Sequence, residues 1–357
     1  MKKKVFHIIS HFDLGGAEKV AFSIAASTNP QIEYHLVEVA RGCGPFSSHF
    51  IQDIEQQCIR YHRSIVKNNK LGIILFPLRF LLLYLRYRPD VIHSHTEIPD
   101  LSVYLFHRIW GWLFKGIKYI RTIHNTVLWR DWERIGKVVE IFFISSHSNI
   151  AISPAVQKMY LQQNGEEPPI IYNGVEETKQ VEFEGTANGK INILFAGRLE
   201  YQKGIDELLA VIQGCKDSNN LMFWIVGAGS RERDVISFAK SNSQVQYLKE
   251  IYGLSAYLAS FDYLFMPSNF EGLGLLSVEA SFSKVPTIIN GCPGLKDTLP
   301  EDWPLKANNN KVEDYLTIFK SILDVNRNEL GRIAYDFVKD RFSIKEMRER
   351  YECLYLS

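Results

Sequence analysis

The stretch 269–286 constrains this chain more than any other, because a strand, a glycine turn and a helix follow one another there. The apolar run 261–266 before it has strand composition, and residues 275–282 have the spacing and composition of a helix. Gly272 and Gly274 lie where this helix would begin. The first backbone N–H groups of a helix have no partner inside the helix, so the turn predicts an anion site, normally for phosphate.

Two carboxylates, Glu271 and Glu279, flank the predicted anion site. Eight residues of ideal helix span about 12 Å, so the two side chains can reach groups on either side of a phosphate. A nucleotide sugar has this layout, with a hexose, a pyrophosphate and a ribose in a row. Acids that accept hydrogen bonds from hydroxyl groups at both ends would hold such a donor in place. The alternative is an ordinary helix with an acidic start and a solvated second acid.

The residues around these acids, Asn-Phe-Glu-Gly-Leu-Gly-Leu-Leu-Ser-Val-Glu-Ala, closely resemble the donor-site signature of retaining GT-B glycosyltransferases. This large family, glycosyltransferase family 4-like, includes glycogen and sucrose synthases and many bacterial polysaccharide and lipopolysaccharide transferases. The resemblance implies an α/β fold, with two Rossmann-like parallel-sheet domains that face one another across a cleft. It also implies that Leu273 and the two glycines beside it bind the nucleotide sugar, with Glu271 on the sugar and Glu279 on the ribose.

Length and composition agree with a two-domain globular protein. A chain of 357 residues exceeds what one hydrophobic core usually holds, and a net charge of +1 argues against a dedicated nucleic-acid binder. The five cysteines are scattered, with no Cys-x-x-Cys pair, which indicates neither a disulfide framework nor a zinc site. This cysteine usage favours a reducing, cytoplasmic setting.

The chain begins with a predicted strand, 5–9, and a helix, 19–26, joined by a turn that contains Gly15 and Gly16. A glycine turn between a strand and a helix again faces phosphate, although the G-x-G-x-x-G dinucleotide fingerprint is absent. A tight turn without a ligand is the alternative. The resemblance implies that this Gly-Gly-Ala-Glu loop faces the donor phosphates or the acceptor.

Two apolar segments follow. Residues 71–87 predict a core-facing helix, since Pro77 and Arg79 interrupt a run that falls short of the about 20 apolar residues needed to span a bilayer. Residues 101–121 interleave aromatic and basic side chains, which suits the surface of an anionic membrane. The alternative for this second segment is an internal helix and a strand with solvated cations.

His124 follows the predicted strand 119–123, at the carboxyl end, where α/β sheets place ligands. A lone histidine is otherwise more often structural. Thr122-Ile-His124 matches the family's Thr-x-His motif, and the resemblance implies that His124 contacts the transferred sugar. An earlier strand ends in His93-Ser-His95; such a pair could ligate a metal, but no third ligand is evident nearby, and the family has a similar strand end without metal.

A second Rossmann-like half, 191–340, follows a polar linker, 176–190. Its first loop, Gly-Arg-x4-Lys-Gly, matches the family's pyrophosphate-binding motif residue for residue. The resemblance therefore implies that Arg198 and Lys203 stabilise the leaving diphosphate, and fixed cations at such a place lower the barrier. Two solvated cations in a loop are the alternative. Gly229 resembles the family's turn near the nucleotide.

The resemblance divides the chain into an acceptor-binding domain, 1–175, the linker, a nucleotide-sugar-binding domain, 191–340, and a C-terminal helix, 341–357, that packs back on the first domain. We predict a retaining, metal-independent hexosyltransferase that forms α-linkages. It would move a hexose or N-acetylhexosamine from a UDP-sugar to a saccharide acceptor linked to polyprenyl pyrophosphate. The product would be a surface polysaccharide, such as O-antigen, lipopolysaccharide or capsule.

The predicted catalytic residues are His124, Arg198, Lys203 and Glu271. No cofactor or metal is expected, because the chain has no Asp-x-Asp pair of the kind that holds a divalent ion in other transferases. No nucleic-acid partner is expected. We expect a cytoplasmic protein, peripheral on the inner face of the cytoplasmic membrane through residues 101–121.

Two other classes of function remain open. A GT-B-shaped sugar-nucleotide epimerase or phosphorylase would use the same donor, and release of nucleoside diphosphate only with acceptor would exclude the epimerase. A non-catalytic nucleotide-sugar-binding or membrane-scaffold protein would bind the donor without turnover. The combination of both acids, both cations and His124 argues against this last class.

Overall fold

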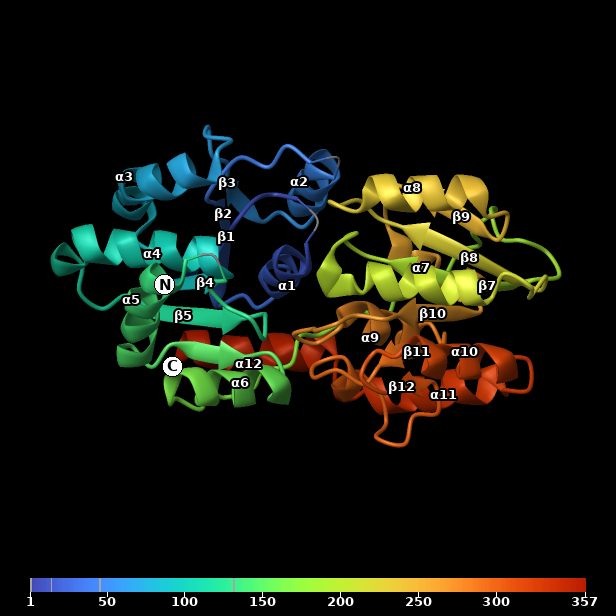
Figure 1. Cartoon of the computed structure of the whole chain (residues 1–357). Helices are drawn as coiled ribbons and strands as arrows, with labels where there is room; N and C mark the ends of the chain where they lie inside the picture. Colours follow the sequence, from blue (N-terminus) through green and yellow to red (C-terminus); the bar gives the residue numbers. More distant parts are fainter. Residues whose placement is uncertain (1, 14, 45, 131) are drawn as a thin grey trace. The chain divides into compact units, whose positions relative to one another are not determined.

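The computed structural model describes residues 2–13, 15–44, 46–130 and 132–357 (Figure 1). They form two compact units: unit 1 comprises Met1–Gly174 and Ile344–Ser357, and unit 2 comprises Val175–Ser343. Leu14, in the predicted glycine turn, lies outside the described residues. The acceptor-binding and donor-binding roles of the two halves stay predictions.

Unit 1 contains a six-stranded parallel sheet with the strand order β3-β2-β1-β4-β5-β6. The order reverses between β1 and β4, and doubly wound sheets bind ligands outside the carboxyl ends of their strands at such a point. The strands are β1 (Lys3–Ile9), β2 (Ile32–Glu38), β3 (Arg60–His62), β4 (Val91–His95), β5 (Lys118–Ile123) and β6 (Asn149–Ala151).

Side chains of these strands alternate between the two faces of the sheet. Phe6 and Ile8 join a hydrophobic core with residues of α3, α4 and α5, whereas His7 between them lies next to Tyr355 of α12. The helix α12 also packs on α1 and β1. The helices of unit 1 are α1 (Gly16–Ala25), α2 (Ser47–Gln56), α3 (Asn69–Tyr87), α4 (Glu97–Trp110), the short η1 (Gly111–Leu113), α5 (Glu133–Ser145), α6 (Pro154–Asn164) and α12 (Ile344–Leu356).

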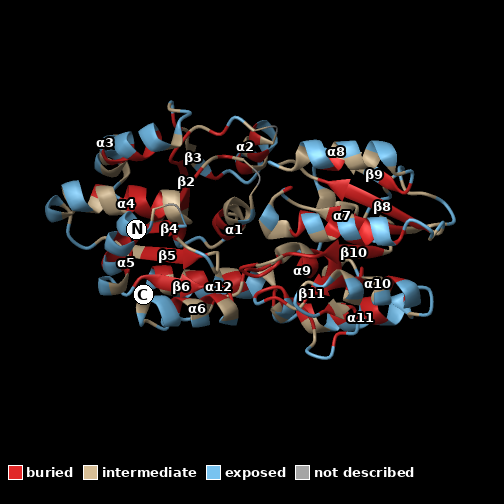
Figure 2. Ribbon diagram, in the orientation of Figure 1, coloured by how far each residue is buried: buried red, intermediate tan, exposed pale blue. Residues whose placement is uncertain are grey.

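Unit 2 has the same topology, with the strand order β12-β11-β10-β7-β8-β9 and a reversal between β7 and β10. Its strands are largely buried beneath the flanking helices (Figure 2). The strands are β7 (Ile191–Ala196), β8 (Leu221–Val226), β9 (Val245–Leu248), β10 (Tyr263–Met266), β11 (Thr287–Asn290) and β12 (Lys306–Ala307). The helices are η2 (Tyr201–Lys203), α7 (Ile205–Gly214), α8 (Glu232–Ser241), η3 (Leu254–Ala256), η4 (Leu258–Ser260), α9 (Leu275–Phe282), η5 (Lys296–Thr298), α10 (Val312–Ser321) and α11 (Arg327–Val338).

The predicted α/β class with two parallel sheets is confirmed, and α9 begins and ends at the predicted residues. All five cysteines are free thiols, in agreement with the prediction that they form no disulfide framework. The strands β3 and β12 were not predicted, because three and two residues carry too little periodicity to identify a strand.

The prediction that 71–87 faces the core is only half correct. One face of α3 packs inward through Gly72, Ile73, Phe76, Pro77 and Phe80. The opposite face, which we call the α3 face, exposes six large apolar side chains: Leu71, Ile74, Leu75, Leu78, Leu82 and Leu85. Within the described part of the chain, no helix combines the length and the apolar composition that crossing a bilayer requires. The prediction that this segment is too short to span is therefore confirmed.

The basic and aromatic segment 101–121 is not one amphipathic element, because it comprises the end of α4, η1 and the start of β5, the helix and strand of the alternative interpretation. The membrane contact of this segment stays a prediction. The helix α4 ends at Trp110, and Arg121 lies in β5, fully buried. The Arg121 guanidinium contacts Asp100 at 2.7 Å and Glu140 at 2.6 Å. A buried cation needs such partners, so Arg121 is unavailable to a membrane. Arg108, Trp112 and Lys115 remain exposed.

Candidate functional site

The two loops of the predicted donor site follow β7 and β10, the neighbouring central strands of unit 2. The chain leaves β7 into the loop with Arg198 and Lys203, and it leaves β10 into the loop with Glu271. Carboxyl ends of neighbouring parallel strands lie at one edge of the sheet. A backbone hydrogen bond joins the loops, from Asn269 N to Gln202 O over 2.8 Å.

Lys203 and Glu271 make the central contact of this site. Lys203 Nζ lies 2.6 Å from Glu271 Oε1, and the Ser268 hydroxyl donates to the same oxygen over 2.8 Å. Both charged side chains are largely shielded from water, which strengthens their attraction. Cys292 lies close by, and its burial, followed by the charge of Glu271, raises the pKa of its thiol to about 12. The thiol is therefore neutral and unreactive beside a charged pair.

Gly204 lets the two loops approach. Its φ of +69° lies in the left-handed region, which costs a residue with a side chain about 1–2 kcal/mol. A Cβ at this position would lie 1.7 Å from the carbonyl oxygen of Pro267. The second glycine of Gly-Arg-x4-Lys-Gly is therefore required both by its backbone conformation and by the neighbouring loop.

The turn before α9 contains Gly272, Leu273 and Gly274. Leu273 is buried, and Gly274 precedes the helix with a φ of +67°, a conformation that glycine adopts without strain. Glu279 lies on α9, buried, and its Oε2 accepts a hydrogen bond from Ser255 Oγ over 2.6 Å. Glu271 and Glu279 therefore have separate polar partners within one unit.

Arg198 belongs to the first of these loops, and Gly229 lies in the turn after β8, at the same carboxyl edge of the sheet. The guanidinium of Arg198 is exposed and donates to Gln202 Oε1 over 2.9 Å. A Cβ on Gly229, in the turn after β8, would lie 2.5 Å from Leu199 O, and Leu199 N donates to Ala228 O over 2.9 Å. The predicted donor-binding residues of unit 2 thus gather on adjoining loops.

The other predicted site residues lie in unit 1. Gly15 is the N-cap of α1, and Gly16 is its first residue. His124 follows β5, and its Nε2 lies 3.1 Å from His95 Nδ1. Burial lowers the pKa of His124 to about 3, so the imidazole is neutral near pH 7. His124 is therefore a neutral hydrogen-bonding group and not a cation.

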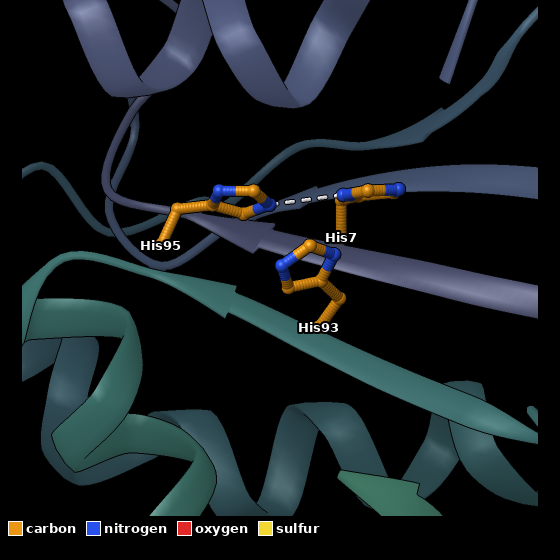
Figure 3. Close-up of side chains that lie close together, drawn as sticks. All are labelled: His7, His93 and His95. Carbon is orange, nitrogen blue, oxygen red and sulfur yellow. Dashed lines mark hydrogen bonds between the residues drawn. The ribbon is translucent and has the colours of Figure 1, made fainter. Parts of the chain in front are cut away.

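The prediction that His93 and His95 have no third partner nearby is wrong. His7 comes from β1, and the ligand atoms of the three histidines lie within 4.8 Å of one another (Figure 3). Register explains the cluster: His7 and His93 are opposite one another in neighbouring strands. Among the described residues, these three are the group that could hold a metal ion. The expectation that the protein uses no metal stays a prediction.

Three residues that hold the predicted groups in place were not themselves predicted. Ser268 and His95 lie at the carboxyl ends of β10 and β4, a position that could have identified both. Ser255 lies in η3, and no motif marks it. These three residues hydrogen-bond to Glu271, His124 and Glu279.

Comparison with known proteins gives concordant results. Residues 14–179 match the family described as Glycosyltransferase Family 4, and residues 190–323 match Glycosyl transferases group 1. An uncharacterised 41.2 kDa protein from the cps region of Klebsiella pneumoniae is 30% identical over 295 residues, 75% of this chain and 79% of that protein. The O-antigen biosynthesis glycosyltransferase WclY of Escherichia coli is 25% identical over 290 residues, with the same two shares.

Solved structures show the fold. Anabaena Alr3699/HepE in complex with UDP-glucose has a TM-score of 0.79 and 17% identity, over 99% of this chain and 100% of that chain. Identity this low supports a shared architecture and no more. The likeness confirms the predicted GT-B fold class.

Proposed function

Because this chain belongs to the glycosyltransferases of group 1 and family 4, we propose that it moves a hexose or N-acetylhexosamine from a UDP-sugar to a saccharide acceptor. The observation that carries the proposal is the contact between Lys203 and Glu271 at the carboxyl edge of β7 and β10. A cation and an acid held together there, next to the start of α9, can bind both parts of a nucleotide sugar.

The predicted residues then have separate roles in binding the donor, and charge sets those of the cations and the acids. Lys203 and Arg198 stabilise the diphosphate that leaves, because it concentrates negative charge and fixed cations lower the barrier. Glu271 accepts hydrogen bonds from the transferred sugar, and Glu279 accepts them from the ribose. His124 contacts the transferred sugar, and the loop of Gly15 and Gly16 contacts the donor phosphates or the acceptor.

The transfer we propose retains the configuration at the anomeric carbon and gives an α-linked product. The bond from this carbon to the diphosphate breaks, the acceptor oxygen bonds to the same face, and its proton passes to the leaving phosphate. No separate nucleophile is needed. Arg198, Lys203 and the N-terminus of α9 supply positive charge, so the proposed reaction needs no metal ion.

The acceptor we propose is a saccharide on polyprenyl pyrophosphate, used at the inner face of the cytoplasmic membrane in the synthesis of O-antigen or capsule. The similarity to WclY, an O-antigen biosynthesis glycosyltransferase, supports this product class. A lipid-linked acceptor requires that the protein reach a membrane surface.

The α3 face supports such a contact. Its six apolar side chains recur at helical spacing and are each 41–68% exposed, which is typical of a helix that lies in a membrane interface. Phe114 packs on Tyr84 of α3 at 4.0 Å between ring centroids, and this contact holds the exposed Trp112 nearby.

Charge at this surface favours an anionic bilayer. The sequence has no acidic residue from 57 to 89 or from 101 to 130. The exposed cations near α3 and η1 are Lys67, Lys70, Arg86, Arg88, Arg108 and Lys115. A second copy of the chain would place like charges together, whereas anionic lipids would neutralise them. We therefore propose that α3 and η1 contact the membrane. Most of the membrane-binding surface then lies on α3 and not in the predicted segment 101–121.

The experiment is a thermal-shift panel of UDP-, GDP- and ADP-sugars on the whole chain, followed by assays of nucleotide release with EDTA. We expect one UDP-sugar to raise Tm, and release that ignores EDTA and requires a lipid-linked acceptor. Turnover without acceptor to an altered sugar nucleotide would identify an epimerase. No shift with any donor, or activity abolished by EDTA, would contradict the proposal.

A further inference from the structure

A cluster of histidines lies at the point where the sheet of unit 1 reverses its strand order. His7 of β1 and His93 and His95 of β4 are fully buried on one face of the sheet (Figure 3). His95 comes two residues after His93, so alternation keeps both side chains on that face. Thr122, on the neighbouring strand β5, shares it. The roles proposed above use none of these three histidines.

Two hydrogen bonds connect this cluster to His124. His95 Nε2 lies 3.0 Å from His7 Nδ1, the contact drawn as a dashed line in Figure 3. His95 Nδ1 lies 3.1 Å from His124 Nε2. The rings of His7, His95 and His124 therefore form a continuous chain, which we call the histidine relay.

The three imidazoles of the relay are neutral near pH 7, because burial lowers the pKa of each. A neutral imidazole has one N–H group and one acceptor nitrogen. Each of the two contacts needs one N–H group, and His95, which takes part in both, has only one. His95 therefore donates in one contact and accepts in the other, so the hydrogen bonds of the relay all point the same way. Two arrangements remain, one that donates toward His124 and one that donates toward His7.

The far nitrogen of His7 distinguishes the two arrangements. His7 Nε2 is buried and has no hydrogen-bond partner. Donation toward His7 would leave an N–H group there without an acceptor, and buried N–H groups without partners are rare and cost about 1–3 kcal/mol. Donation toward His124 leaves His7 Nε2 as an acceptor nitrogen, with no N–H group unsatisfied. The favoured arrangement therefore places the hydrogen of every ring, including His124, on Nδ1.

We propose that His7 and His95 are positioning residues that hold His124 as the Nδ1–H tautomer, so that its ring donates a hydrogen bond to a hydroxyl oxygen of the transferred sugar. The inference rests on the function proposed above for its last step alone. His7 is two hydrogen bonds away from His124 and acts only through His95.

A metal ion is the competing interpretation of the same histidines, since three imidazoles within 4.8 Å could bind zinc. The existing contacts favour the relay. His93 Nδ1 lies 2.7 Å from Tyr355 OH, and its Nε2 lies 2.7 Å from Thr122 Oγ1. Both nitrogens of His95 are also engaged. A metal would force both rings to give up a buried hydrogen bond.

The first test reads the tautomer directly and needs no substrate. In the whole chain labelled with 15N-histidine, long-range 15N–1H correlation distinguishes a protonated ring nitrogen from an unprotonated one. We expect protonated Nδ1 and unprotonated Nε2 at His124. We also expect His7→Leu to shift both signals toward a mixture, because it removes the first donor. Protonated Nε2 in the wild type, or one equivalent of tightly bound metal by elemental analysis, would overturn the relay.

The second test measures the consequence for turnover. His7→Leu should lower kcat about 5- to 10-fold, the equivalent of one neutral hydrogen bond. Affinity for UDP, which lacks the transferred sugar, should stay within twofold. His7→Asn should recover most of the loss, because its amide can donate near the position of Nδ1. Tyr34→Phe is the matched control, since it changes a ring beside His7 but no member of the relay.

The two tests fail in different ways. If no donor binds or turns over, the proposed function fails, and the tautomer measurement still decides the relay. If His124 is the Nδ1–H tautomer but His7→Leu keeps the wild-type kcat, the positioning role is wrong. An Asn variant as slow as the Leu variant, at equal Tm, would show that packing and not donation matters at residue 7.

Discussion

Lys203 and Glu271 lie 68 positions apart in the sequence, yet Lys203 Nζ is 2.6 Å from Glu271 Oε1. This contact fixes the position of the Lys203 ammonium group at the carboxyl edge of β7 and β10. A diphosphate would then compete with Glu271 for the cation, and the carboxylate would turn to the hydroxyl groups of the sugar. The contact therefore couples the residue that we propose binds the diphosphate to the one that we propose binds the sugar.

The first prediction concerns this pair. Lys203→Met should lower kcat/KM at least about 100-fold, because the leaving diphosphate loses a fixed cation. It should also lower Tm, since Glu271 is left buried without its counter-charge. The double variant Lys203→Met/Glu271→Gln should recover Tm but not activity. Nucleotide release and differential scanning fluorimetry give the two readouts.

Lys216→Met is the control for that experiment, because Lys216 is an exposed cation of the same unit outside the site. It should keep both Tm and kcat/KM. Wild-type kcat/KM in Lys203→Met would refute the diphosphate role of Lys203.

The second prediction compares two glycines with nearly the same backbone. Gly204 has a φ of +69° and a carbonyl oxygen 1.7 Å from its ideal Cβ position, whereas Gly253 has a φ of +68° and nothing within 4 Å. Gly253→Ala should cost about 1–2 kcal/mol from its conformation alone. Gly204→Ala should lower Tm further and weaken UDP binding, because it separates the two donor loops. Equal losses of Tm in the two variants would show that the close approach is unimportant.

The third prediction is acid sensitivity of unit 1. Burial lowers the pKa of His7 to about 3, and those of His93 and His95 well below the ordinary value of 6.5. The unfolded chain binds protons at these histidines more readily than the folded one. Their contribution to the free energy of unfolding is therefore complete above pH 6.5 and is lost as the pH falls below that value. The free energy of unfolding should therefore decrease as the pH falls from 6.5 toward 5.

Calorimetry between pH 7.5 and 5 tests this expectation. Tm should fall steeply below pH 6.5, and hydrogen exchange should increase first in β1 and β4. A Tm that is constant over this range would mean that the histidines take up protons in the folded state.

The fourth prediction concerns the α3 face. The whole chain should sediment with vesicles that contain phosphatidylglycerol, less with pure phosphatidylcholine, and less at about 0.5 M salt, because salt screens the basic residues. Leu78→Glu/Leu82→Glu should weaken binding at least about 10-fold, since two apolar groups no longer enter the interface.

Leu323→Glu is the matched control for that variant, because Leu323 is as exposed as Leu82 but lies in unit 2. It should bind vesicles as the wild type does. If the α3 variant instead changed the oligomeric state in solution and not vesicle binding, the face would be an interface between copies.

Much of the fold was predictable because its signals are local. Strand composition followed by a glycine turn and helical spacing identified the loops of both central strands, and the bounds of α9 were predicted to the residue. The α3 prediction failed on one point: composition shows that a helix is apolar all round, but not which of its faces the fold leaves uncovered. Arg121 was misjudged for the same reason, since its buried partners come from α4 and α5.

The sequence alone determined the α/β class, the positions of the glycine turns and the residue types of the predicted donor loops, since backbone preferences and periodicity act over a few residues. Only the tertiary structure decided which side chains meet. Strand order brings Lys203 to Glu271, and register brings His7 to His93 and, through His95, to His124. These contacts join residues far apart in the chain, so they depend on the packing of whole sheets and leave no local pattern.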